Sequence, residues 1–343
     1  MTTVWLLRGL SVAMAFATLW CAARAVAIAT GDVRLAMVAT AAVGLVPQWG
    51  AVMGIASTDP PATLAAAIAT LLVLTTLQSP SAWYLPALTG LVAGLAYATK
   101  VTSVFLVPMM AVALWGVARH AGVRQTCRHA AWLAGGLFVG AAWVPIRAWI
   151  VFGDPLARAF KRDVLAIGGF QVVEGPPMLS LAFAQQLQTM VFEPFWARFG
   201  SLGAGPLPGT RLWWIYAMAS AGLLVAFGVG AASLRVLWRR PSKSADWMVA
   251  SSATGVVAGV SLWAWINLVP QADVIVHWTP RHILPLTVPL LVVVASGTQR
   301  FSSVMTGSAR GWLRRMLALG LLVLALAGLA VLRGVVLSFH FGY

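Results

Sequence analysis

The acidic side chains of this chain are few, and they gather in a small number of loops. The 343 residues include only eight Asp and Glu, and six of them fall in segments that the distribution of Lys and Arg places on one side of a membrane. Charged groups beside a bilayer are costly unless they line a polar cavity. That face is therefore the predicted site of chemistry, and its acidic residues are Asp59, Asp154, Asp163, Glu174, Glu193 and Asp273. We take Asp59 and Asp154 as the candidate catalytic carboxylates.

Asp59 lies just before Pro60, at the start of an apolar run. An Asp that precedes a proline at the first helical position is good N-capping chemistry, so a role as a helix cap is one interpretation. The other is a carboxylate that faces a polar cavity and binds a metal ion, a sugar hydroxyl or an acceptor. No spacing of His, Cys or acidic residues is typical of a metal site, so no cofactor is indicated and the need for a divalent metal ion stays undetermined.

Basic residues form three groups on the same face, where topology alone disfavours them. Arg147 lies about two turns inside an apolar run, and either snorkels to the interface or binds a lipid diphosphate, whose oxygens match a guanidinium. The set predicted to bind substrate phosphate is Arg147, Arg158, Lys161, Arg162 and Arg281. One diphosphate carries too much charge for a single guanidinium near a low-dielectric core. Arg147 and Arg281 are therefore expected to open into one outer cavity, with Asp59 on its wall.

The composition identifies the class of protein. Hydrophobic residues make up 60% of the chain and charged residues 9%, whereas soluble domains average about 25% charged residues. The chain is therefore predicted to be an all-α polytopic membrane protein. The formal net charge of +15 comes from short basic loops that set orientation and meet anionic headgroups, so the expected partner is the lipid bilayer and not nucleic acid.

Apolar runs separated by charges predict about ten transmembrane helices. They cover residues 9–28, 34–56 (broken at Pro47), 60–78, 83–98, 101–118, 130–152, 211–234, 247–268, 283–299 and 316–336. Thr99 and Lys100 interrupt the fourth and fifth runs. This stretch is either a tight outer hairpin or one long broken helix.

Short loops rich in Lys and Arg predict the orientation. Basic residues gather at 119–128, 235–243 and 300–315, and the positive-inside rule assigns these loops to the cytoplasm. The Asp59 loop, the Lys100 turn and the long loop 153–210 then lie outside, as does the start of the chain. Asp32 and Asp246 are expected to be solvated charges on the cytoplasmic side.

The chain 1–343 is predicted to be a single transmembrane domain, multi-pass in the cell inner or plasma membrane. Loop 153–210 is its outer subregion, on the periplasmic or extracellular side. Two segments of this loop have apolar residues at helical spacing and polar residues on the opposite side, so they are expected to be helices lying in the interface plane. Their apolar positions are Leu156, Phe160, Val164 and Ile167, then Leu179, Phe183, Leu187 and Val191.

A series of short motifs resembles the membrane glycosyltransferases of the GT-C fold, such as aminoarabinose transferases and protein O-mannosyltransferases. Residues 57–59 (Ser-Thr-Asp) resemble their Asn-Asn-Asp type loop, and residues 90–100 resemble their Gly-Leu-x-x-x-Thr-Lys stretch. Residues 147–155 resemble the Arg-Asn…Tyr-Gly-Asp-Pro motif. Residues 195–200 and 280–285 resemble Phe-Trp-x-x-Phe-Gly and Arg-Tyr-x-x-Pro. The last three are most similar to a group of bacterial polytopic membrane proteins.

The resemblance implies a GT-C-like fold and transfer of a sugar, with inversion, from a polyprenyl-phosphate donor to an acceptor outside the cytoplasm. Family members place the acidic general base in the first outer loop, after the first span. This chain is expected to lack both, which agrees with a start on the outer side. A non-catalytic lipid-linked-sugar transporter or cell-envelope assembly scaffold is the alternative. Further outer-face candidates are Lys100, Glu193, Trp196, Arg198 and His282.

Overall fold

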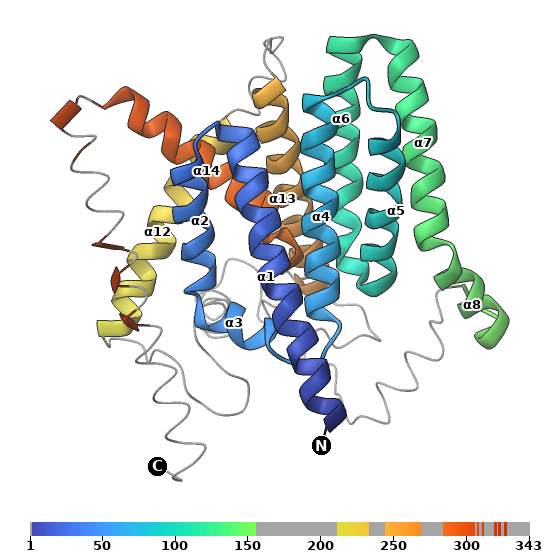
Figure 1. The fold of residues 1–343 in the computed structure, drawn as a ribbon, viewed down its shortest axis with the longest axis horizontal. Coiled ribbons are helices and arrows are strands. Elements are labelled where there is room, and N and C mark those ends of the chain that lie inside the picture. Colours follow the sequence, from blue (N-terminus) through green and yellow to red (C-terminus); the bar gives the residue numbers. More distant parts are fainter. Residues whose placement is uncertain are drawn as a thin grey trace.

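The structure, a computed structural model, describes residues 2–155, 211–232, 244–268 and 284–305, with a few residues between 307 and 327. Within these residues every regular element is a helix, and Figure 1 shows the long helices packed side by side. The elements are α1 (Thr2–Thr30), α2 (Val33–Gly44), α3 (Pro47–Met53), α4 (Asp59–Gln78), α5 (Tyr84–Thr99), the 3₁₀ helix η1 (Val101–Phe105), α6 (Leu106–Ala121), α7 (Val123–Ala141), α8 (Trp143–Phe152), α12 (Arg211–Ala231), α13 (Ser244–Leu268) and α14 (Thr287–Val304).

Five helical stretches of the described chain are long and apolar enough to cross a membrane. They are Thr3–Thr30, Asp59–Gln78, Val101–Ala121, Val123–Phe152 and Leu284–Val304. This confirms the prediction of an all-α protein of membrane type. The count of ten spans is not confirmed, because Val33–Gly44, Tyr84–Thr99 and Ala217–Ala231 are apolar but shorter, and most of residues 316–336 lies outside the described residues.

The break expected at Pro47 separates two helices. α2 ends at Gly44, and Pro47 is the first residue of α3. Proline suits this position because its fixed φ matches a helix and its missing N–H is one that no helix would use there. Figure 1 shows α3 lying across the end of the bundle at which α4 begins.

The stretch around Lys100 is a hairpin and not one long helix. In Figure 1, α5 and α6 run in opposite directions, with η1 between them. Lys100 closes α5 in an extended conformation, with φ −153° and ψ 116°. The backbone N–H of Ser103 donates to the Lys100 carbonyl oxygen at 2.9 Å, so Lys100 stands at the tip of the hairpin.

Glycines allow α5 and α7 to pack backbone against backbone. A Cβ atom at Gly90 would lie 2.0 Å from the carbonyl oxygen of Leu133, and one at Gly136 would lie 2.2 Å from that of Ala87. Gly94 and Gly140 follow at four-residue spacing, the small-xxx-small pattern of close membrane helices. The glycines of residues 90–100 therefore hold α5 in place, and with it Lys100.

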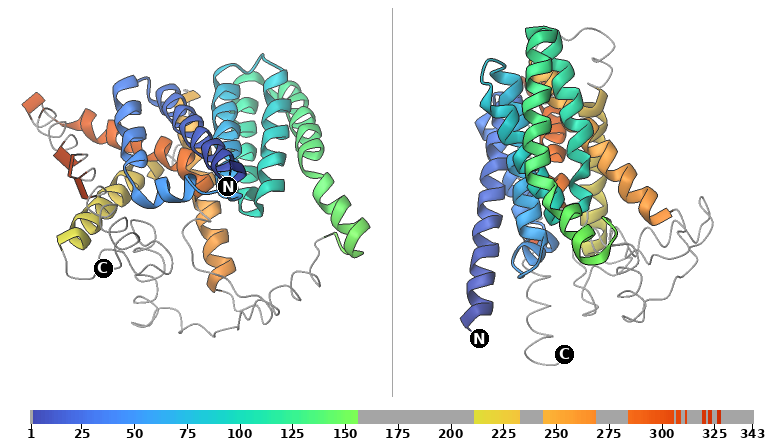
Figure 2. Two further views of the ribbon diagram at one scale, coloured as in Figure 1. Left: turned by 60° about the horizontal axis from the view of Figure 1, so that its bottom comes forward. Right: turned by 90° about the vertical axis from the view of Figure 1, so that its right-hand side faces the viewer.

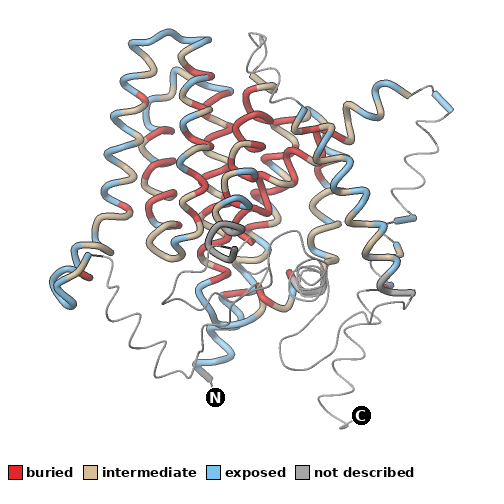
Figure 3. The backbone as a smooth tube through the Cα atoms, turned by 180° about the vertical axis from the view of Figure 1, so that it is seen from behind, coloured by how far each residue is buried: buried red, intermediate tan, exposed pale blue. Residues whose placement is uncertain are grey.

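The core lies between α1, α4, α6, α13 and α14. Figure 3 shows buried residues concentrated along the central helices and exposed residues along α7 and α8. Trp247 of α13 and Phe105 of η1 are among the largest fully buried side chains. On α8, by contrast, Trp149 and Ile150 are 67% and 79% exposed, as expected for a surface that faces lipid.

The two ends of the bundle differ in their charged residues. One end carries Asp59, Lys100, α3 and α8, and we call it the outer end because the charge pattern predicts it to be non-cytoplasmic. The opposite, inner end carries the basic turn between α6 and α7 and an ion pair between Asp246 and Arg300. Figure 1 and the right-hand view of Figure 2 put the start of α1 and α8 at the same, outer end.

Candidate functional site

Asp59 is the first residue of α4, and its side chain does not cap the helix. The N-cap is Thr58, which makes no side-chain capping hydrogen bond. The second and third helical residues, whose N–H groups a cap would bind, are Pro60 and Pro61. The first free N–H, that of Ala62, donates to the Thr58 carbonyl oxygen at 3.2 Å. The capping interpretation of Asp59 is therefore wrong.

The Asp59 carboxylate instead pairs with Lys100. The Lys100 ammonium donates to Asp59 Oδ1 across 41 residues of sequence, from the hairpin tip to the start of α4. The two side chains are only 11% and 5% exposed. The sequence had placed both residues on the outer face but had not paired them. Opposite charges at the ends of neighbouring spans, on the same predicted side, were the available signal.

Burial determines what this ion pair does to the fold. Two charges withdrawn from water are costly, and their mutual attraction offsets the cost only while both are present. Removing one partner leaves an uncompensated buried charge, at a cost of about 3–5 kcal/mol. The pair therefore fixes the hairpin tip against α4 and keeps a carboxylate and an ammonium together at the outer end.

Three hydroxyl groups adjoin the pair in sequence. Thr63 lies one turn after Asp59 in α4, while Thr102 and Ser103 follow Lys100 in η1. Their oxygens are buried and have no hydrogen-bond partner within the described part of the chain. The outer end thus combines one carboxylate, one ammonium and three hydroxyls that can each donate and accept.

Arg147 and Asp154 lie on or just after α8, at the same end. Arg147 is exposed, and Ala148 beside it is buried. Gly153 ends α8 in the left-handed region, with φ +66°, and Asp154 after it is half-buried. Among the described residues, Arg147 makes no ion pair with Asp59.

The remaining candidates fall outside the described residues. They are Arg158, Lys161, Arg162, Glu193, Trp196, Arg198, Arg281 and His282. The convergence of Arg147 and Arg281 on one cavity therefore stays a prediction, as do the interfacial helices of loop 153–210. Among the described residues, no group of three or more His, Cys, Asp or Glu could hold a metal ion.

The two inner acidic residues have structural partners. Asp32 caps α2, with its Oδ1 accepting from the Leu35 N–H at 3.0 Å. Asp246 accepts from Arg300 Nη2 at 2.9 Å and so links α13 to α14. Both residues are partly exposed, but Asp246 lies in the first turn of α13 and not in a loop, and each makes a specific hydrogen bond.

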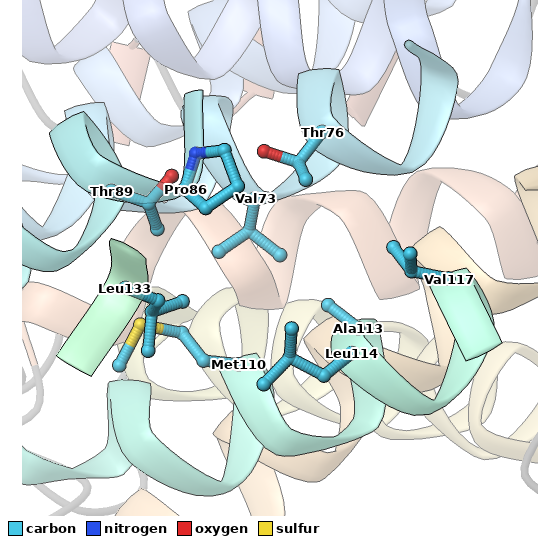
Figure 4. Close-up of a pocket in the computed structure, with 9 residues that line it drawn as sticks. All are labelled: Val73, Thr76, Pro86, Thr89, Met110, Ala113, Leu114, Val117 and Leu133. Atoms are coloured by element: carbon cyan, nitrogen blue, oxygen red, sulfur yellow. The ribbon is translucent and has the colours of Figure 1, made fainter. Parts of the chain in front are cut away.

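A small cavity between α4, α5, α6 and α7 is not a candidate site. Its volume is about 10 Å³, and Figure 4 shows a lining dominated by apolar side chains such as Val73, Met110 and Leu133. Its two hydroxyls are already paired, since Thr76 and Thr89 donate to backbone carbonyl oxygens of their own helices. A cavity of this size accommodates about one water-sized sphere, so it is a packing void.

Comparison with known proteins adds no relative: no family model, curated protein or solved structure matches the chain. Function must therefore be argued from the outer end itself.

Proposed function

We propose that the chain is a membrane glycosyltransferase, or a relative of one, that transfers a sugar from a polyprenyl-phosphate donor to an acceptor outside the cytoplasm. The Asp59–Lys100 ion pair carries the proposal. It joins two motifs of the GT-C resemblance, residues 57–59 and 90–100, that lie 41 positions apart. The contact supports the proposal because it brings both motifs to one place at the outer end, as a shared site requires.

The outer end has basic residues that suit the lipid phosphate of such a donor, and carboxylates that suit its sugar or the acceptor. Arg147, Arg158, Lys161, Arg162 and Arg281 are the candidates to bind the lipid phosphate, for which guanidinium geometry is suited. Asp59 is the candidate to receive the acceptor proton or to orient a sugar hydroxyl, and Asp154 is the second candidate carboxylate. All these groups belong to segments predicted to lie on the outer side of the inner or plasma membrane.

One observation favours a second, non-catalytic function. Lys100 occupies Asp59 Oδ1, an oxygen that an acceptor hydroxyl would otherwise approach. A site in which this contact persisted would hold a lipid-linked sugar without activating an acceptor. The second candidate is therefore a lipid-linked-sugar transporter or an assembly scaffold of the cell envelope.

Donor turnover in proteoliposomes tests the proposal. Purified protein would be reconstituted with a panel of polyprenyl-phosphate sugars and membrane-fraction acceptors, and the release of free polyprenyl phosphate would be followed by mass spectrometry. We expect one donor to be consumed by the parent protein, and its consumption to be lost in Asp59→Asn. Arg300→Met, at the inner end, is the matched control and should keep the activity.

Two outcomes would contradict the transferase proposal. Donor that crosses the bilayer with its sugar intact would establish the transporter alternative. If no donor of the panel is bound, consumed or moved across the bilayer, the protein does not act on these lipid-linked sugars.

A further inference from the structure

The hydroxyls beside the Asp59–Lys100 pair lack the partners that buried hydroxyls normally have. Thr63 and Ser103 are each 1% exposed, and neither they nor Thr102 form a hydrogen bond with any described residue. Buried polar side chains in native proteins are nearly always paired. Of the nine buried side-chain polar atoms that lack a partner among the described residues, three are these hydroxyls, each within four positions of Asp59 or Lys100 along the chain.

Each of the three hydroxyls belongs to a residue that follows Asp59 or Lys100 closely along the chain. Thr63 follows Asp59 by four residues in α4, so the two side chains lie on the same face of the helix. Thr102 and Ser103 follow Lys100, and the Ser103 N–H donates to the Lys100 carbonyl oxygen. Each hydroxyl-bearing residue is thus within four positions of Asp59 or Lys100 along the chain.

Other buried threonines of the same bundle show what Thr63 omits. Thr70, two turns further along α4, donates to the Ala66 carbonyl oxygen at 2.8 Å, and Thr89 in α5 donates to that of Leu85 at 2.7 Å. This bond to the residue four positions earlier is the usual arrangement for Thr within a helix. Thr63 does not make it, so its hydroxyl remains available for a different acceptor.

We propose that the Asp59–Lys100 pair is a two-state element that opens when a phosphate ester binds. In the open state Lys100 donates to a phosphate oxygen, and the hydroxyls of Thr63, Thr102 and Ser103 donate to the Asp59 carboxylate. Naming a polyprenyl phosphate as the ligand rests on the proposed function. The assignment makes Lys100 a phosphate-binding residue and the three hydroxyls positioning residues for Asp59.

The physical reason is the cost of a buried charge without a partner. When the Asp59 carboxylate loses the Lys100 ammonium in a low-dielectric site, it needs other hydrogen-bond donors. Without them, the free-energy cost of separating the pair is too high. The three unpaired hydroxyls are the donors that we assign to this role. Lysine suits the moving partner, because its ammonium is a compact charge on a flexible four-carbon stem.

The element also links donor binding to the chemistry of Asp59. A ligand shifts such an equilibrium only by its difference in affinity for the two states. A phosphate contacts Lys100 only in the open state, so it favours that state. Asp59 Oδ1 then becomes accessible to an acceptor only while the donor phosphate is bound.

The Thr63 hydroxyl provides the sharpest test, with Thr70 as its matched control. Thr63→Val removes a hydroxyl that is unpaired in the closed state but donates to Asp59 in the open one. We expect purified Thr63→Val to unfold at the parent temperature or slightly above it, and to bind polyprenyl phosphate about tenfold more weakly, the equivalent of one hydrogen bond to a charged group. Thr70→Val should bind the lipid as the parent does. Parent-like affinity in Thr63→Val would overturn the proposal.

Modification of Asp59 by a carbodiimide, mapped by mass spectrometry, reports the open state without any sugar transfer. Adding polyprenyl phosphate should increase modification of the parent several-fold, whereas neutral polyprenol should not. Lys100→Met should be modified at the higher level without ligand. Inorganic phosphate and phosphatidylglycerol identify the source of the phosphate, and an increase with either supports the two-state element. No increase with any of the three phosphates would overturn it.

The two readouts separate this inference from the proposed function. If Asp59 becomes modified with polyprenyl phosphate but no sugar is transferred from any donor, the element stands and the transferase proposal fails. If sugar is transferred while Asp59 modification never changes, the transferase proposal stands and the element fails.

Discussion

Among the residues that the structure describes, each end of the bundle carries one ion pair between helical elements, and the two pairs differ in burial. At the outer end, Lys100 and Asp59 are 11% and 5% exposed. At the inner end, Arg300 and Asp246 are 38% and 27% exposed, with 2.9 Å between Nη2 and Oδ1. The same chemistry thus occurs once in a nearly closed site and once within reach of water.

Because of this difference in burial, the outer pair constrains the fold, whereas the inner pair contributes little to stability. Water and salt screen the inner pair, and such pairs contribute about 0–1 kcal/mol to stability. The outer pair is screened far less, so loss of either partner is costly. Buried ionisable residues of membrane proteins typically mark functional sites, which is why the outer end is the candidate site.

The largest expected effect comes from breaking the outer pair on one side. Lys100→Met keeps most of the side-chain volume but leaves the Asp59 carboxylate buried without its ammonium. We expect a loss of about 3–5 kcal/mol in the free energy of unfolding, measured by titration with sodium dodecyl sulfate in mixed micelles. A loss below about 1 kcal/mol would mean that the outer pair behaves like a surface pair.

A smaller effect is expected from displacing the helix that carries Lys100. A Cβ at Gly136 would lie 2.2 Å from the Ala87 carbonyl oxygen, so Gly136→Ala should push α7 away from α5 and cost about 1–3 kcal/mol. Gly135→Ala is the matched control, because nothing lies within 4 Å of a Cβ placed there. Equal stability of the two variants in the same titration would contradict the close packing of α5 on α7.

The smallest effect is expected at the inner end. Arg300→Met removes the partner of Asp246 where both groups reach water, so its cost should be about 1 kcal/mol or less. Salt should weaken what remains of this contribution. Measuring the free energy of unfolding of the parent and of Arg300→Met at low and high sodium chloride gives both the cost of the substitution and its dependence on salt. A cost as large as that of Lys100→Met would remove the contrast between the two ends.

Much of the helical framework could be predicted because it follows from local patterns. Apolar runs and basic loops predicted most of the described helices, and Pro47 predicted the break between α2 and α3. The role of Asp59 was harder. The pair Pro60-Pro61 removes two N–H groups that a side-chain cap would bind, yet an Asp before a proline is also a common start of a helix. The structure decides between these interpretations, because it shows which group the Asp59 carboxylate binds and which oxygen accepts from the Ala62 N–H.

The sequence placed opposite charges at neighbouring span ends, but it did not determine which of them pair across the bundle. Asp59 meets Lys100 because α5 packs on α7 through glycines and on α4 through its opposite side, and no local pattern encodes that arrangement. The same holds for Asp246 and Arg300, 54 residues apart. The unpaired state of the Thr63 hydroxyl depends on a side-chain rotamer, which sequence spacing does not specify.

A double-mutant cycle on Asp59 and Lys100 measures how far the two buried charges depend on each other. The free energy of unfolding would be measured for the parent, Asp59→Asn, Lys100→Met and the double variant, with the Asp246→Asn and Arg300→Met cycle as reference. We predict a coupling energy of about 2–3 kcal/mol for the outer pair, so that the double variant loses less stability than the sum of the two single losses, and a coupling energy of less than about 1 kcal/mol for the inner pair. Additive losses at Asp59 and Lys100 would show that the two charges do not depend on each other, and would contradict the account.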